Sequence, residues 1–274
     1  MATAPPHEQL CFLQFSCPEL PRPPMRLLLD FFCRFGWGMA VGLILTPAAI
    51  VPAGFFRVNL LVVLGLATAA AAVAWQGEAA SSAWLPATAA AITAWVGSVA
   101  WLAERQRTGR WFCGAAAAWL AIATVIVAPR DASEGSVLAG FAGWLAPTLA
   151  LLSGLVTGLT VHAMLLGHWY LNAPGMRVDA LRRMIDVALA VWGLQLAVSV
   201  SQLVSGGTAA GGITAGALLT LRWLAGLVGL PILLVLARKT LDIPNTQSAT
   251  GILYVASLAA ILGELTAQLL QASV

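Results

Sequence analysis

Residues 58–75 read VNLLVVLGLATAAAAVAW, a stretch without a charged side chain that lies between Arg57 and Glu78. An α-helix rises about 1.5 Å per residue, so roughly 20 apolar residues are needed to cross the hydrocarbon core of a bilayer. The length and composition of this stretch therefore predict a membrane-spanning helix. The fold depends on how often such a stretch recurs.

The composition of the whole chain points the same way. Of its 274 residues, 60% are hydrophobic and only 9% are charged, whereas ordinary soluble domains have about 25% charged residues. We therefore expect the bilayer to be the solvent for the fold, and nothing supports nucleic-acid binding. Cys11, Cys17, Cys33 and Cys113 form neither a CxxC pair nor the four-thiolate set of an iron-sulfur cluster, so no bound metal is expected.

Apolar runs bounded by charge, glycine and proline predict an all-α polytopic membrane bundle of about eight transmembrane helices. We expect a single transmembrane domain over residues 25–274, with helices at 26–49, 58–75, 83–102, 111–128, 144–171, 178–204, 216–238 and 247–270. The stretch from Val137 to Leu171 is too long for one straight span, so residues 137–143 are interpreted as an interfacial segment, with a re-entrant element as the alternative.

Residues 1–24 differ from the rest of the chain. They are rich in proline and lack both the basic start and the apolar core of a signal peptide. We expect a disordered tail. Because a hydrophobic helix begins directly after Met25 and Arg26, the hypothesis is that the tail is an extension of the gene model.

The positions of lysine and arginine predict the orientation. Most of them follow spans one, three, five and seven: Arg57, Arg105, Arg107, Arg110, Arg177, Arg182, Arg183, Arg238 and Lys239. The opposite side holds Arg22, Arg26 and Arg130, with Glu78 and Glu134. Because cytoplasmic loops carry the excess of positive charge, both termini are expected on the non-cytoplasmic side of a cell inner membrane.

Small and aromatic residues indicate how the helices pack. Gly38 and Gly42 in span one, and Gly154 and Gly158 in span five, have the GxxxG spacing of close helix contacts. Tryptophan side chains gather at the expected span ends, where they favour the headgroup region. They are Trp75, Trp84, Trp101, Trp111, Trp144 and Trp169.

Four ionisable residues inside the expected spans form the first candidate site. Asp30 and Arg34 have the i,i+4 spacing of one helical face, while Arg222 and Glu264 lie at matching depth on sequential antiparallel spans. All four are expected in the outer third of the membrane, in one polar cluster. Ionisable groups in a bilayer are costly unless paired, so the cluster is either a structural ion pair or a site for protons or a polar headgroup.

Two histidines in span five form the second candidate site. His162 lies at a depth similar to that of Asp186 in span six, which allows either a proton relay or a simple buried hydrogen bond. His162 and His168 are also the candidate ligands of a haem b, although six residues separate them by about 120° around a helix, so the two cannot clasp one haem. A single haem would require a further ligand such as Met164 or Met184, or one from another subunit.

No motif predicts an autonomous active site. The order of a Ser/His/Asp triad, an HExxH motif and a phosphate-binding glycine loop are all lacking, and no hydrophilic domain is expected for nucleotide binding. Internal sequence repeats are not evident. A transporter nevertheless remains an alternative, because Pro231 and other glycine and proline breaks interrupt the spans.

Three segments resemble the eight-helix membrane-anchor subunits of dimethyl-sulfoxide and polysulfide reductases. They are GWLAPTLALLSGLVTG at 143–158, GALLTLRWLAGL at 216–227 with an embedded Arg222, and LAAILGELTAQLL at 258–270 with its Gly-Glu pair. The helix count and the outside termini also fit. Residues 61–75 lack the histidine associated with quinol oxidation in the dimethyl-sulfoxide reductase anchors, which places quinol chemistry in doubt more than the fold.

The resemblance implies a membrane subunit of a respiratory oxidoreductase that exchanges electrons between quinone and an iron-sulfur or other redox subunit. Asp30, Arg34, Arg222 and Glu264 would then flank a quinone pocket, with a carboxylate handling protons and an arginine binding a quinone carbonyl. The arginine-rich loops would dock the partner. The alternatives are a permease with an intramembrane polar path and a b-type cytochrome.

Overall fold

The computed structural model describes residues 24–76, 82–128, 137–173, 175, 177–204, 213–243 and 245–272. Their longer elements are all helical: α1 (Pro24–Leu45), α2 (Ala53–Gln76), α3 (Trp84–Leu102), α4 (Gln106–Val127), α5 (Val137–Asn172), α6 (Asp179–Val204), α7 (Ile213–Leu221), η3 (Arg222–Gly229), α8 (Leu230–Thr240) and α9 (Thr246–Ala272). Within these residues, eight helices are long and apolar enough to cross a membrane, with α7, η3 and α8 forming one span. The prediction of an all-α polytopic bundle is confirmed.

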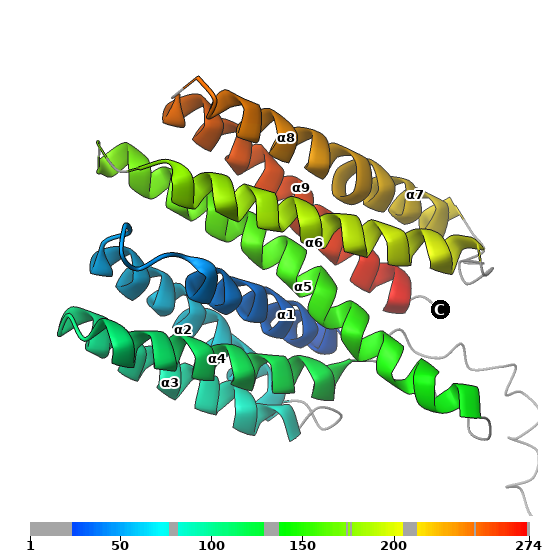
Figure 1. The fold of residues 1–274 in the computed structure, drawn as a ribbon. Helices are drawn as coiled ribbons and strands as arrows, with labels where there is room; N and C mark the ends of the chain where they lie inside the picture. Colours follow the sequence, from blue (N-terminus) through cyan, green and yellow to red (C-terminus); the bar gives the residue numbers. More distant parts are fainter. Residues whose placement is uncertain are drawn as a thin grey trace, which may run out of the picture.

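The segment predicted at the interface, residues 137–143, is helical and continuous with the candidate span that begins at Ala146. It forms the first two turns of α5, a single helix of 36 residues that continues through Pro147. At about 1.5 Å per residue the helix is roughly 54 Å long, well beyond the hydrocarbon thickness, and it projects from the bundle in Figure 1. Residues 1–23, which include almost all of the predicted tail, lie outside the described part of the chain.

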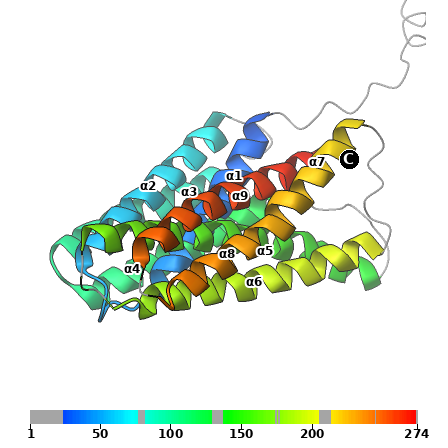
Figure 2. The same ribbon diagram turned by 90° about the horizontal axis from the view of Figure 1, so that it is seen from above.

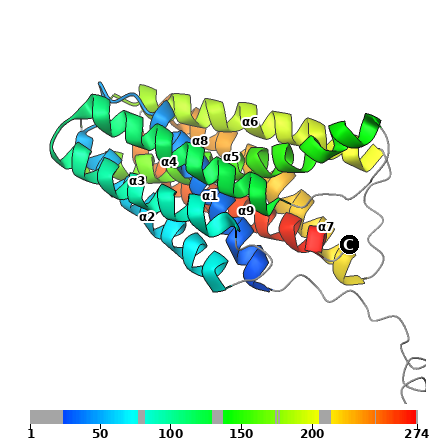
Figure 3. The ribbon, with the colours of Figure 1, turned by 90° about the horizontal axis from the view of Figure 1, so that it is seen from below.

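The spans form two groups of four that meet along α1 and α5. In the first group α1 packs on α2 and α4, and α3 joins those two; in the second, α5 packs on α6 and α9, with α8 between them. Figure 1 shows α5 running between the two groups, with the start of α1 and the C-terminus at the same end. The helices share one general direction in Figure 2 and Figure 3, as a membrane requires.

The contact between α1 and α5 depends on the two predicted GxxxG pairs. An added Cβ on Gly38 would lie only 2.0 Å from the carbonyl oxygen of Gly154, and one on Gly158 would lie 2.4 Å from the Cα of Gly38. Only glycine lets the two backbones approach so closely. The pairs therefore bind to each other across the two groups, and we call this contact the glycine seam.

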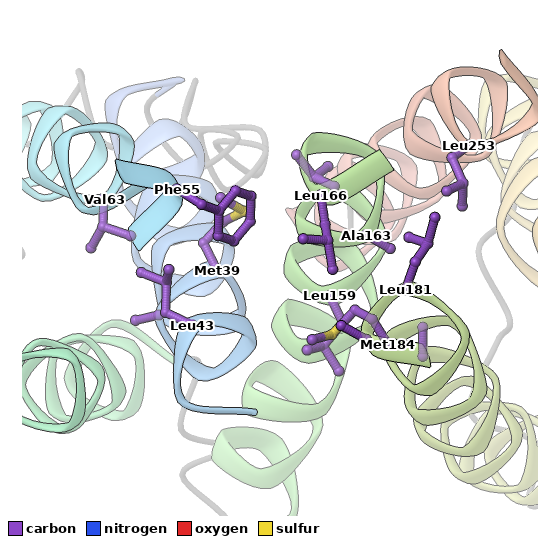
Figure 4. Close-up of a cluster of buried hydrophobic side chains, with 14 of the residues drawn as sticks. Met39, Leu43, Phe55, Val63, Leu159, Ala163, Leu166, Leu181, Met184 and Leu253 are labelled. Carbon is purple, nitrogen blue, oxygen red and sulfur yellow. The ribbon is translucent and has the colours of Figure 1, made fainter. Parts of the chain in front are cut away.

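Apolar side chains from both groups pack around the seam. Figure 4 shows Met39 and Phe55 on one side of α5 and Met184 and Leu253 on the other, all buried. Trp101 belongs to this interior rather than to the headgroup region, because it is 1% exposed and stacks on Phe56. Trp75 and Trp111 are 72% and 81% exposed at helix ends, as the belt interpretation predicts.

The arginine-rich loops lie together at the end of the bundle opposite the termini. Arg238 forms ion pairs with Asp186 at 2.8 Å and with Asp242 at 3.2 Å, and Arg182 lies 3.6 Å from Asp242. These contacts join α6 to the turn between α8 and α9. The start of α6 and the turn between α8 and α9 thus form one arginine-rich surface at this end of the bundle.

Candidate functional site

Arg34 is the centre of a buried polar site. One helical turn separates it from Asp30, and the spacing turns both side chains to one face of α1. The guanidinium donates from Nε to Asp30 Oδ1 at 2.8 Å and from Nη2 to Oδ2 at 2.5 Å. This two-point contact fixes the plane of the guanidinium and leaves Nη1 directed at other helices.

The remaining nitrogen of Arg34 connects three helices. Nη1 donates to Glu264 Oε1 on α9 at 3.0 Å and to Ser153 Oγ on α5 at 3.3 Å. Gln268, one turn after Glu264, donates to the same carboxylate oxygen at 2.8 Å. Ser153 directly precedes Gly154, so the glycine seam brings α5 close enough for this contact.

Asp30, Arg34 and Glu264 are 7%, 2% and 4% exposed, and we call these three residues the charged cluster. Charges buried this deeply are tolerated only when they are paired and hydrogen-bonded. Two carboxylates share one guanidinium, so the cluster carries a net negative charge when both are ionised. A proton or a second cation is needed for balance.

The prediction that Asp30, Arg34 and Glu264 meet is correct, but the partners and depth differ in part. Within the described residues Glu264 forms its ion pair with Arg34, and Arg222 instead contacts Ser199 Oγ at 3.4 Å. Arg34 also lies near the middle of its span, Met25–Leu45, rather than in the outer third. Helices α1 and α9 both pack against α5, so the long side chain of Arg34 can extend from α1 to Glu264 on α9.

Arg222 nevertheless shares a cavity with Glu264. The cavity is small, with a volume of about 20 Å³, which is room for about one water molecule. Its lining comes from α5, α6, η3, α8 and α9: Val156, Thr157, Gln195, Arg222, Gly226, Leu227, Leu230, Ala260, Gly263 and Glu264. The wall combines apolar residues with four polar ones, Thr157, Gln195, Arg222 and Glu264.

The cavity lies where span seven departs from α-helical geometry. Residues Arg222–Gly229 form a π-helical segment, and such segments are frequent at functional sites because they redirect side chains and loosen the backbone ladder. Gly226 meets Gly263 nearly backbone to backbone, since a Cβ on Gly263 would lie 2.7 Å from the Cα of Gly226. The Gly-Glu pair of α9 thus combines a close helix contact with the carboxylate that lines the cavity.

The predicted link between His162 and Asp186 is wrong as a hydrogen bond. His162 is fully buried and its Nε2 lies 2.8 Å from Thr46 Oγ1 on α1, while Asp186 bonds Arg238 at a half-exposed position. Asp186 therefore lies on the arginine-rich surface rather than beside His162. A relay between these two residues has no direct contact to support it.

The histidines do not fit a shared haem. The ring of His162 packs so tightly that a Cβ on Gly42 would lie 2.5 Å from its Cγ, and Phe55 covers it edge-on. His168 is exposed, with Nδ1 held 2.9 Å from Tyr254 Oη. Ligation at Nε2 of His162 would break its bond to Thr46 and would displace α1.

Three polar residues of the site were not singled out from the sequence. Gln268 was detectable as the i,i+4 partner of Glu264, and Ser153 as the neighbour of a GxxxG glycine. Gln195 has no such signal, because only the packing of α6 turns it to the cavity. Comparison with known proteins finds no matching family model, no matching curated protein and no matching solved structure.

Proposed function

We propose that this chain is the membrane subunit of a respiratory oxidoreductase and that it exchanges electrons with a quinone at the cavity between Glu264 and Arg222. The observation that carries the proposal is the set of contacts made by Glu264. Its carboxylate is held by Arg34 and Gln268, yet it also lines a cavity opposite a second arginine. A fixed carboxylate opposite a cation, at the wall of a cavity between helices, suits a substrate that exchanges protons together with electrons.

The chemistry sets what each residue would do. Quinol oxidation releases two electrons and two protons; the electrons would pass to a redox centre of a partner subunit, one proton to Glu264 and the other to water at the cavity mouth. Arg222 would hydrogen-bond a quinone oxygen and stabilise negative charge on it. Arg34 and Asp30 would keep Glu264 in place without touching the substrate. The cavity as it stands has room for about one water molecule, so a quinone ring would enter only after the lining side chains move apart.

The resemblance of residues 143–158, 216–227 and 258–270 to reductase anchor subunits supports the same proposal. These segments supply most of the cavity lining, including Arg222, Gly263 and Glu264. The arginine-rich surface formed by the loops after spans five and seven would be the docking surface for an iron-sulfur subunit. The site then lies in an inner membrane, nearer to the end with the termini.

Purification of the native protein in a mild detergent tests the proposal. Mass spectrometry of copurifying chains, quinone extraction and an optical spectrum would be measured on one sample. Stoichiometric redox subunits together with bound quinone would support it. A protein that contains neither, after purification from respiring cells in amounts matched to its partners, would overturn it.

A transporter is the second candidate, because the π-helical segment Arg222–Gly229 interrupts a span beside a polar cavity. Broken helices at mid-membrane sites are typical of secondary transporters. Reconstituted vesicles separate the two candidates. Solute-dependent proton uptake without any redox partner would favour transport, and its absence alongside quinone-linked electron transfer would favour the oxidoreductase.

A further inference from the structure

Four arginines at one end of the first helix group have no acidic partner, and we call them the unpaired arginines. They lie at the start of α2, in the turn between α3 and α4, and at the start of α4: Arg57, Arg105, Arg107 and Arg110. Each is exposed, and none forms an ion pair within the described residues. Glu104, in the same turn, is also exposed and makes no ion pair there. This surface therefore has a net positive charge.

Packing between aromatic residues and a glycine brings the three segments together. Phe56 on α2 stacks on Trp101 of α3, with ring centroids 4.2 Å apart. Gly109 on α4 meets the same indole so closely that a Cβ on Gly109 would lie 2.6 Å from Trp101 Nε1. The unpaired arginines adjoin these residues in the sequence. The same contacts therefore gather the four positive charges at one end of the bundle.

The helix ends add to this excess of positive charge. Neither α2 nor α4 has an acidic residue in its first turn. Arg107 lies in the first turn of α4, and Arg57 and Arg110 directly follow the first turns of α2 and α4. The N-terminus of a helix carries a positive partial charge, so a cation there is unfavourable and an anion is favourable. A bound anion would satisfy the arginines and both helix ends together.

The arginine-rich surface of the second group is balanced instead. Arg177 pairs at 2.7 Å with Asp179, which lies in the first turn of α6, where a negative charge is favourable. Arg238 pairs with Asp186 and Asp242, and it lies in the last turn of α8, where a positive charge is favourable. The charges of that surface are matched from within the chain. The unpaired arginines are therefore the surface that fits an external anion.

The neighbours of the unpaired arginines indicate which anion fits. Val58, Leu102 and Trp111 are 49%, 58% and 81% exposed, so apolar surface that faces lipid borders the positive charges directly. Tryptophan favours the headgroup region, which places the arginines at the depth of lipid phosphates. A guanidinium binds a phosphate through two parallel hydrogen bonds.

We infer that the unpaired arginines bind the phosphate headgroup of an anionic phospholipid. The lipid tails would lie along the apolar surface beside Trp111, while the headgroup contacts the starts of α2 and α4. This site is separate from the cavity at Glu264 and does not depend on the proposed function. It also differs from the arginine-rich surface, to which the docking of a partner subunit is assigned.

Native mass spectrometry of the purified full chain tests the inference by measuring bound dioleoylphosphatidylglycerol and dioleoylphosphatidylcholine. An arginine near a membrane surface contributes about fivefold to the binding of anionic lipid, so Arg107→Gln/Arg110→Gln should bind phosphatidylglycerol roughly 30-fold more weakly. Its binding of phosphatidylcholine should not change. The control Arg177→Gln/Arg238→Gln removes the same charge from the arginine-rich surface and should bind both lipids like the wild type.

A second variant, Arg57→Gln, tests the same site from another helix and should bind phosphatidylglycerol about fivefold more weakly. It keeps the test decisive if the double variant fails to fold. Equal binding of phosphatidylglycerol by the wild type and by these variants would overturn the inference, as would a wild type that does not prefer it to phosphatidylcholine. Displacement of the lipid by an equal concentration of glycerol 3-phosphate would show that a soluble phosphate, not a lipid, is the ligand.

Discussion

Arg34 on α1 and Glu264 on α9 form an ion pair at 3.0 Å that joins the two four-helix groups of the bundle. The same guanidinium holds Asp30 and Ser153, so one side chain connects α1, α5 and α9. The pair lies beside the glycine seam, and the seam determines how close the helices approach. The packing of the bundle and the proposed chemistry therefore both depend on the region where α1, α5 and α9 meet.

Replacing Arg34 with Met should destabilise the protein strongly. Two carboxylates would remain buried without their cation, and breaking such a pair costs roughly 3–5 kcal/mol. Arg34→Lys should fall between Met and the wild type, since a lysine cannot bond Asp30 and Glu264 in the same geometry. Thermal unfolding in detergent measures the effect, with the exposed Arg105→Met as control. Equal melting temperatures for Arg34→Met and the control would refute the structural role of the pair.

The glycine seam should be intolerant of a single methyl group. A Cβ on Gly158 would lie 2.3 Å from the backbone carbon of Gly38, so Gly158→Ala must push α1 and α5 apart. We expect a loss of roughly 1–3 kcal/mol, typical of overpacked interiors. Gly114→Ala is the control, because nothing lies within 4 Å of its Cβ position. A Gly158→Ala protein as stable as Gly114→Ala would show that the helices do not touch there.

Asp186→Asn should leave the proposed redox function intact. Its ion pair with Arg238 is partly exposed at the arginine-rich surface, and surface pairs contribute about 0–1 kcal/mol. Quinone-linked turnover of the assembled complex measures the outcome, with Asp179→Asn as a neighbouring exposed control. A loss of turnover confined to Asp186→Asn would revive the relay with His162.

His162 is expected to be structural. Its ring fills the space beside Gly42 and bonds Thr46, so His162→Ala should remove packing and a hydrogen bond together, at roughly 2–4 kcal/mol. The reduced-minus-oxidised spectrum of wild-type protein provides the second readout. Haem bands that disappear in His162→Ala while the protein stays folded would contradict this interpretation.

The fold could be predicted from the sequence because a bilayer imposes a simple rule on length and composition. Runs such as 58–75 and 247–270 are apolar over the thickness of the membrane, and the structure has helices there. The glycine pairs correctly predicted close helix contacts, since small residues at i,i+4 leave a groove for a partner helix, although not that the two pairs meet each other. The predicted helix at 144–171 already continued through Pro147, as neighbouring groups in a membrane allow, but α5 begins seven residues earlier, at Val137.

The site was only partly predictable. Depth along each span indicated that Asp30, Arg34 and Glu264 would be close, but depth says nothing about which helices are neighbours. The pairing of Arg34 rather than Arg222 with Glu264 depends on the order of helices around α5. The π-helical segment that turns Arg222 toward the cavity leaves no pattern in residues 222–229 that a periodicity of 3.6 would reveal.

The most direct test of the central claim is the turnover of Glu264→Gln with decylubiquinol in native membranes. Glutamine keeps the hydrogen bond from Arg34 but cannot accept a proton, so we expect turnover to fall at least about tenfold while assembly is unchanged, as a lost general base predicts. Glu104→Gln, exposed at the opposite end of the bundle, should retain full turnover. Full turnover in an assembled Glu264→Gln complex would contradict the assignment of the cavity as a quinone site with Glu264 as its proton acceptor.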